Sequence, residues 1–161
     1  MSTTDLPRSA QRVQTAAVEL GLDIDIAAFP EGTRTADDAA RAVGCAVDQI
    51  VKSMIFAADD AGIVLALTSG ANQVDPERLA MVAGAARCGR ADPEQVRAVT
   101  GYAIGGVAPI GHNEPVPTFV DPHLLAFGEV WAAAGTPRHV FPIAPTRLVE
   151  VTGAVAAAFT R

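Results

Sequence analysis

The sequence predicts an α+β fold with a curved, mainly antiparallel β-sheet flanked by helices. Residues 50–57 and 63–68 form two β-rich runs joined by the short polar segment 58–62, which is typical of a hairpin at the centre of a sheet. Helical periodicity occurs on both sides of this pair, and the strict β-α-β alternation of a parallel sheet is absent. With 161 residues and 50% hydrophobic content the chain can bury one core, so we expect a single domain over residues 1–161.

The first three elements follow from periodicity and capping residues. A helix is expected from Ser9, a suitable N-cap, to Gly21, because the apolar residues between them recur at the i, i+3, i+4, i+7 spacing. A short strand is expected over residues 24–29. Thr35 and the acid three residues later match a capping box, which predicts a second helix that ends at Gly44.

Two more helices begin with the same pattern after the predicted hairpin. At Asp75 and at Asp92 an aspartate is followed by proline and then glutamate, which places a carboxylate at the N-cap, proline at the first helical position and an acid in the first turn. Gly84 and Gly101 stand where these helices should end. Both segments are therefore predicted as short capped helices.

The C-terminal part of the chain alternates short strands and turns. A strand is predicted over residues 118–120, followed by a turn at Asp121, which we interpret as an N-cap or turn residue, with support of a pocket as the alternative. A hairpin is predicted over residues 129–143 with its turn at 135–137. A final helix is expected around residues 146–151.

Composition and charge argue against several classes of protein. The net charge of −6 argues against a broad basic surface that binds nucleic acid non-specifically, although local contacts to one nucleic-acid end stay open. The longest apolar runs fall far short of the roughly 20 residues that cross a bilayer, so we expect no membrane-spanning segment. Cys45 and Cys88 lack Cys-x-x-Cys spacing and no signal peptide precedes them, so we expect reduced thiols in a cytoplasmic protein.

Residues 101–112 form a loop with four glycines and one proline. The glycine spacing fits neither the dinucleotide fingerprint nor the Walker phosphate loop. A long turn in which glycine supplies positive φ is one interpretation. The alternative rests on the loop's apolar residues, which we expect to lie against the core while backbone N–H groups face a cleft and receive a carbonyl or phosphate oxygen; these residues are Ile104, Val107, Ala108 and Ile110.

Lys52 is the second unusual feature, because it is the only lysine of the chain, beside eleven arginines. Strand alternation places it on the same face as the apolar residues Ile50, Met54 and Phe56. An isolated buried ammonium is costly, so Lys52 must reach an anion, bind hydrogen-bond acceptors or extend to water. A strand lysine with a packed stem and a solvated head is the structural alternative to a functional one.

Together the lysine strand and the loop resemble the YbaK and prolyl-tRNA synthetase-associated editing domains, including the free-standing ProX-like proteins. The resemblance extends from about residue 30 to residue 153. Its fairly specific element has two parts, a lysine followed by serine at residues 52–53 and Gly-x-x-x-Pro at residues 105–109. The residues that carry it are 35–40 before Gly44, 50–53, 105–111, and 118–121 followed by Leu124 and Leu125.

The resemblance implies a curved, mainly antiparallel sheet and hydrolysis of the ester between a wrong amino acid and tRNA, most often tRNA for proline. By position, Lys52 would contact the terminal nucleotide and its phosphate, and Gly105 and Gly106 would belong to the Gly-x-x-x-Pro loop that holds the carbonyl and the attacking water. Other positions would contact substrate, namely Thr35, Ser53, Met54, Val107, Ala108, Pro109, Ile110, Gly111 and His112. The implied partners are the acceptor end of mischarged tRNA and prolyl-tRNA synthetase.

This chemistry needs neither a nucleophilic triad nor a cofactor. An aminoacyl ester is already activated and has a 2′-hydroxyl beside it, so placing a water and stabilising the oxyanion can suffice. His112, His123 and His139 lack metal-ligand spacing, so no metal is expected. A non-catalytic module that binds a tRNA 3′ end or a nucleotide is the alternative function.

The family's branches differ at the loop. Ala108 stands where the branch that clears cysteine typically has serine, which favours alanine, serine, threonine or 2-aminobutyrate as the amino acid removed. The sequence leaves the choice among these residues and cysteine open, because one methylene changes binding by only about 1 to 3 kcal/mol.

Overall fold

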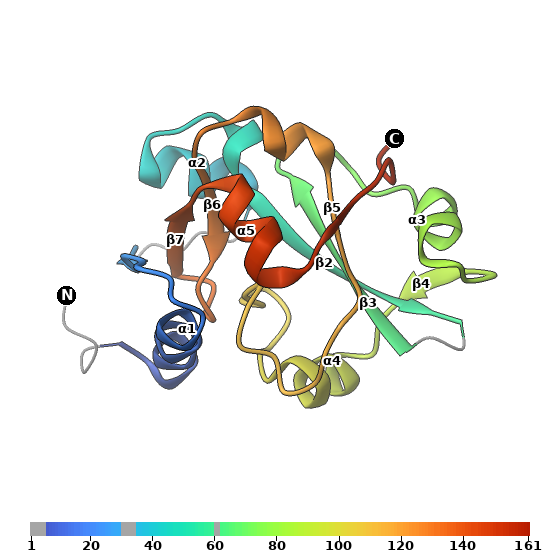
Figure 1. Ribbon diagram of the computed structural model, residues 1–161, viewed down its shortest axis with the longest axis horizontal. Coiled ribbons are helices and arrows are strands. Elements are labelled where there is room, and N and C mark those ends of the chain that lie inside the picture. Colours follow the sequence, from blue (N-terminus) through green and yellow to red (C-terminus); the bar gives the residue numbers. More distant parts are fainter. Residues whose placement is uncertain (1–5, 30–34, 60–61) are drawn as a thin grey trace.

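The computed structural model describes residues 6–29, 35–59 and 62–161 (Figure 1). The predicted turn at 58–62 includes residues 60–61, which lie outside this described part. The helices and strands, in chain order, are α1 Arg8–Glu19, β1 Ala27–Ala28, α2 Ala36–Val43, the 3₁₀ helix η2 Val47–Gln49, β2 Val51–Ala58, β3 Gly62–Ser69, α3 Pro76–Ala83, β4 Cys88–Arg90, α4 Pro93–Thr100, β5 Thr118–Val120, the 3₁₀ helix η3 Pro122–Ala126, β6 Val130–Ala133, β7 His139–Ile143, α5 Pro145–Thr152 and β8 Val155–Ala156.

The described strands form two sheets. The larger has the order β4-β2-β3-β5-β8, in which β5 runs parallel to both β3 and β8 and the other pairs are antiparallel. The smaller, with the order β1-β7-β6, is antiparallel. A single parallel bridge between Ile50 and Trp131 connects them. The predicted α+β class with mainly antiparallel pairing is confirmed, and the structure adds the division into two sheets.

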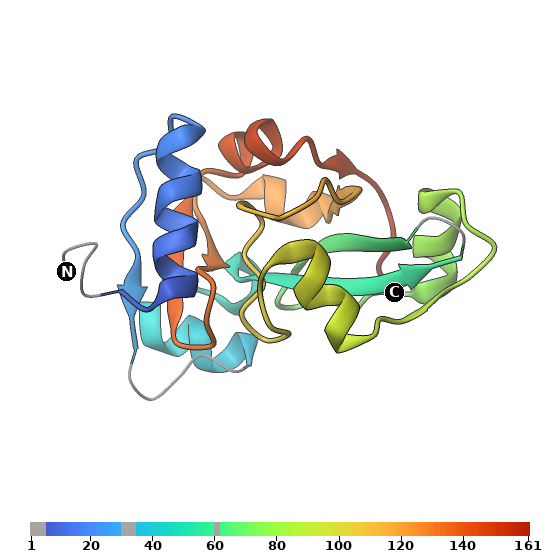
Figure 2. The same cartoon turned by 90° about the horizontal axis from the view of Figure 1, so that it is seen from below.

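β3 is the central strand, and its two faces enter different hydrophobic cores. Leu65 and Leu67 belong to the main core, which helices α1, α4 and α5 also enter, while Val64 and Ala66 pack in a smaller core with Leu79 of α3. This alternation follows from the two-residue period of a strand covered on both faces. α1 and α3 lie at opposite ends of the molecule, with α1 alongside the small sheet (Figure 2).

Most predicted helix boundaries are confirmed by their hydrogen bonds. Thr35 Oγ1 accepts a hydrogen bond from the backbone N–H of Asp38 at 3.0 Å. Oδ1 of Asp92 accepts one from the backbone N–H of Glu94 at 3.1 Å. Asp121 is the N-cap of η3, since its Oδ1 accepts from the N–H of His123 at 3.0 Å. The glycines predicted to end the second, third and fourth helices all have left-handed φ, at Gly44, Gly84 and Gly101.

Several local predictions were wrong. α1 has Pro7 at its N-cap instead of Ser9, because the carbonyl of Pro7 already accepts the first helical bond, from the N–H of Gln11 at 2.9 Å. The strand expected over 24–29 is reduced to Ala27–Ala28, since only these two residues pair with β7. The short strands β4 and β8 were not predicted, because neither has an alternating pattern and each forms only by pairing with a distant strand.

The cap of α3 gives a first quantitative prediction. Asp75 Oδ1 accepts from the N–H groups of Glu77 and Arg78 at 3.0 and 3.4 Å, so Asp75→Ala should lower the free energy of unfolding by about 1 kcal/mol. Asp75→Asn is the matched control, because its side-chain oxygen can still accept these bonds. Urea denaturation measures the free energy of unfolding of both variants. Equal values for Asp75→Ala and Asp75→Asn would show that the cap contributes nothing to stability.

Candidate functional site

A cavity of about 600 Å³ lies between the two sheets. One wall is the edge of β2, because β4 pairs only with residues 56–58 of that strand and leaves residues 51–55 uncovered on that side. The start of α2, the glycine-rich loop and the β6–β7 hairpin form the other walls. Six of the predicted site residues line this cavity, and they are Thr35, Lys52, Ser53, Met54, Gly105 and Val107.

Lys52 is the chemically distinctive residue of the cavity. It is half-buried, and its Nζ donates to the backbone carbonyl of Asn72 at 2.5 Å. No carboxylate of the described residues forms an ion pair with it. Burial lowers the pKa of Lys52, while the negative charge of Asp121 raises it. A neutral acceptor uses one of the three ammonium hydrogens, so charge and donors remain for an anionic ligand.

The cavity is positively charged although the chain as a whole is acidic. Arg90, on β4, lines it together with Lys52, and none of its described lining residues is Asp or Glu. Sequence reasoning missed Arg90, because β4 carries no pattern of its own and reaches the site only through its pairing with β2. Two cations, with no acid among the described lining residues, favour a ligand that carries phosphate or carboxylate.

The near half of the glycine-rich loop faces this cavity. Gly105 has a φ of 98°, a conformation that favours glycine, and both Gly105 and Val107 line the cavity. Their backbone N–H groups have no hydrogen-bond acceptor within residues 6–29, 35–59 and 62–161, whereas the N–H of Gly106 donates to Ala103 at 3.1 Å. As far as the described residues go, these two N–H groups are therefore available to bind an oxygen atom.

Gly106, between these two residues, packs closely against the backbone of the β6–β7 turn. A Cβ atom at this position would lie 2.7 and 2.8 Å from the Cα and N of Thr136, and 2.9 Å from the carbonyl carbon of Gly135. Only glycine therefore lets the loop approach the β6–β7 turn this closely. The position of the loop depends on this contact.

The apolar residues of the loop were predicted to lie against the core, and most do. Val107, Ala108 and Ile110 are 3%, 0% and 4% exposed. Ile104 contradicts the prediction, since it is 56% exposed at the rim of the cavity. Ala108 is fully enclosed by the core and does not line the cavity.

The far half of the loop lies outside this site. Pro109, Ile110, Gly111 and His112 line a second cavity of about 340 Å³. Nε2 of His112 is bonded to the carbonyl of Ala108 at 2.7 Å, and burial lowers the pKa of this histidine. Because a carbonyl only accepts, Nε2 carries the proton, and His112 connects two parts of the loop. The structure does not bring these four residues to the cavity of Lys52.

α1 holds the end of the loop. Nε of Arg12 donates to the carbonyl of Gly111 at 2.7 Å, and the hydroxyl of Tyr102 donates to the carbonyl of Ile110 at 2.8 Å. Burial raises the pKa of Tyr102 to about 12, so its hydroxyl stays protonated as a donor. The loop is therefore fixed at this end by two side chains outside the cavity.

None of the described lining residues is His, Cys, Asp or Glu, so this part of the cavity holds no Ser–His or Cys–His pair. Ser53 Oγ is enclosed and has no hydrogen-bond partner among the described residues. Burial is the main cause that raises the pKa values of Cys45 and Cys88, which keeps both thiols protonated. The described residues also contain no group of three or more metal-ligating side chains, and none of their helices has the length and apolarity to span a bilayer.

A cavity whose described lining carries two cations, backbone N–H groups without a described acceptor and no acidic side chain defines a protein that binds an anionic ligand and can polarise a carbonyl. The chain belongs to the aminoacyl-tRNA editing domain family, which matches residues 30–151. The predictions of this family and of an aminoacyl-tRNA deacylase are confirmed.

Three similar proteins match all or most of this chain, one of them only within a much longer chain. A crystal structure described as that of a candidate trans-editing enzyme for prolyl-tRNA synthetase is 44% identical, with a TM-score of 0.91 over 97% of this chain and 99% of that one. EbsC of Enterococcus faecalis, named as a candidate Cys-tRNA(Pro)/Cys-tRNA(Cys) deacylase, is 25% identical over 78% of this chain and 76% of its own. The proline–tRNA ligase of Lactiplantibacillus plantarum is 30% identical over 68% of this chain but only 19% of the ligase.

Proposed function

We propose that this chain hydrolyses the ester of tRNA for proline that carries a small wrong amino acid. The observation that supports this most is that one cavity holds both the ammonium of Lys52 and the N–H groups of Gly105 and Val107. Among the residues that the structure describes, the ammonium has no ion pair and the two N–H groups have no acceptor. A phosphate and an ester carbonyl are the two groups of a charged tRNA end that need such partners.

The reaction follows from these groups. Lys52, with Arg90 beside it, binds the phosphate of the terminal nucleotide, and the N–H groups of Gly105 and Val107 receive the ester carbonyl. A water attacks the carbonyl carbon with the 2′-hydroxyl of the terminal ribose assisting, and the oxyanion forms at the loop. The bond to the ribose oxygen then breaks, that oxygen takes a proton, and free amino acid and tRNA leave. Positioning and oxyanion stabilisation supply the acceleration.

Part of the cavity wall is apolar. Apolar residues of β2, β6 and β7, together with the residue before β2, line the cavity, namely Met54, Trp131, Ala133, Val140 and Ile50. Within the proposal, the amino acid removed is alanine, cysteine, serine, threonine or 2-aminobutyrate, and an apolar wall alone discriminates among them only weakly.

A panel of tRNA for proline charged with each of these amino acids tests the proposal. We expect release of at least one amino acid well above spontaneous hydrolysis, while proline itself stays attached. Lys52→Ala, purified in the same way, controls for contaminating deacylases. A wild type that binds the charged tRNA but releases nothing would support the non-catalytic binding module instead. The net charge of −6 predicts weak affinity that improves when prolyl-tRNA synthetase presents the substrate.

A further inference from the structure

The acceptor for Lys52 belongs to a tight turn at residues 69–72, directly after β3. The N–H of Asn72 donates to the carbonyl of Ser69 at 2.9 Å, which closes the turn. The N–H of Gly70 donates to the carbonyl of Ile50 at 2.8 Å, and a Cβ at Gly70 would overlap the carbonyl oxygen of Val47 and lie 2.8 Å from Cβ of Ala36. This turn has little room to move.

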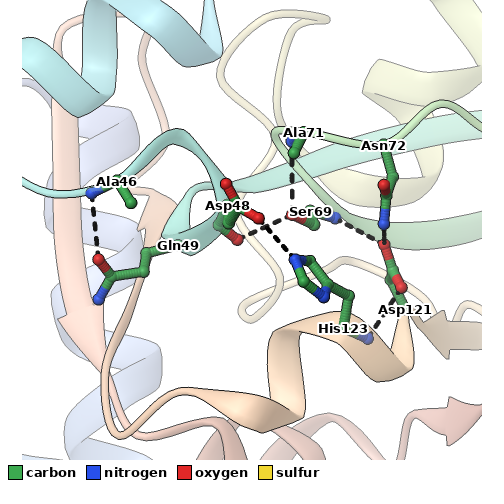
Figure 3. Close-up of polar contacts among 8 residues, drawn as sticks. All are labelled: Ala46, Asp48, Gln49, Ser69, Ala71, Asn72, Asp121 and His123. Carbon is green, nitrogen blue, oxygen red and sulfur yellow. Dashed lines mark hydrogen bonds and ion pairs between the residues drawn. The ribbon is translucent and has the colours of Figure 1, made fainter.

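Asp121 holds the same turn from the other side (Figure 3). Its Oδ2 accepts from the N–H of Ser69 at 3.1 Å and from Nδ2 of Asn72 at 2.9 Å, while Oδ1 accepts from the N–H of His123 at 3.0 Å. The Asp121 residue is only 2% exposed. A cap of η3 requires only the third of these bonds, so the other two serve the turn.

We infer that Asp121 is a positioning residue for Lys52, because its carboxylate fixes the 69–72 turn and the Asn72 carbonyl of that turn fixes the ammonium in the cavity. The inference rests on the proposed function, in which this ammonium binds the substrate phosphate. Asp121 does not line the cavity, so it acts through Asn72 and not on the substrate.

The negative charge of Asp121 has a second effect, which is on the pKa of the Lys52 ammonium. It raises the pKa of Lys52 against the effect of burial, and so favours the protonated form that binds phosphate. Other titratable groups at this turn are Asp48 and His123, which bond to each other at 2.6 Å, and the hydroxyl of Ser69 donates to the backbone carbonyl of Asp48 at 2.8 Å. His123 therefore offers a control that alters the network and leaves Asp121 in place.

The single lysine of the chain permits a direct test. Protein without a lysine-containing tag, grown with lysine labelled with ¹³C at Cε, gives one side-chain signal whose titration reports the pKa of Lys52. In Asp121→Asn we expect this pKa to fall further and kcat/KM for deacylation to drop about tenfold. The alkaline limb of the pH–rate profile, corrected for spontaneous hydrolysis, should move to lower pH. His123→Ala should change neither the pKa nor the profile.

Asn72→Ala separates the two effects of Asp121. It removes the bond from the turn to the carboxylate but keeps the charge, so kcat/KM should fall several-fold while the pKa of Lys52 stays near the wild-type value. This variant also carries the test should Asp121→Asn fail to fold.

An unchanged lysine titration in folded Asp121→Asn, or full activity of Asn72→Ala, would overturn the inference. The titration needs no substrate. A wild type that releases no amino acid would therefore defeat the proposed function while the link between Asp121 and Lys52 could still be measured.

Discussion

Lys52→Ala should lower kcat/KM for deacylation by at least about 100-fold, with little loss of stability. The variant removes the ammonium that the proposal places on the substrate phosphate. Among the described residues, the hydrogen bond lost in the folded state joins Lys52 to the neutral carbonyl of Asn72. Single-turnover deacylation measures the first effect and urea denaturation the second.

The direction of the stability change follows from the lowered pKa of Lys52. Because the folded-state pKa lies below the unfolded value, the unfolded chain binds more protons between the two, and stability rises as pH rises through that window. At neutral pH the buried charge therefore opposes folding. Lys52→Met, which keeps the apolar stem, should be at least as stable as wild type. A variant that unfolds at neutral pH would show that Lys52 is structural.

Lys52→Arg is the matched control for charge. Guanidinium keeps the positive charge but is planar and larger than an ammonium, so it should fit the space beside Asn72 poorly and recover only a small part of the activity. Full activity in Lys52→Arg would show that charge alone suffices and that the geometry at Asn72 is irrelevant.

Gly106→Ala should lower both stability and activity. The added Cβ would lie 2.7 to 2.9 Å from backbone atoms of Gly135 and Thr136, so the loop must move, at a cost of roughly 1 to 3 kcal/mol in the free energy of unfolding. The same movement displaces the N–H groups of Gly105 and Val107, and a shift near 1 Å can reduce kcat about 100-fold.

Gly128→Ala is the control for this prediction, because a Cβ at that loop position would meet no atom within 4 Å. It should leave kcat and the urea midpoint close to wild type. Equal effects of the two substitutions would mean that the contact of Gly106 with the β6–β7 turn does not position the loop.

Local signals in the sequence were reliable where a few neighbouring residues decide the structure. The aspartate and proline at Asp75 and Asp92 specify helix starts because the cap forms with N–H groups two or three residues away. The β2–β3 hairpin was predicted correctly for the same reason, because two β-rich runs joined by a short polar segment are a local signal. Ser9 was wrong because several residues near a helix start can serve as the cap, and the local pattern does not choose between them.

The site was predictable only in part. Lys52 stood out as a lone charge in an apolar run, and the glycines of the loop stood out by composition, so the sequence identified both features that meet at the cavity. It did not show that the loop divides between two cavities, with Gly105 on one and His112 on the other. Which loop residues face each cavity depends on which of them are buried against the core, and the sequence does not show this.

By itself, the sequence determined the fold class, the capped helices, the central hairpin and the residues that mark an editing domain. Only the tertiary structure decided that Arg90 joins Lys52, that Gly106 packs on the β6–β7 turn, and that Asp121 reaches Lys52 through Asn72. Caps and alternation come from contacts within a few residues. The hydrogen bonds that hold the cavity's lysine join groups 20 and 49 residues apart, Lys52 with Asn72 and Asn72 with Asp121, and only the packed core brings these together.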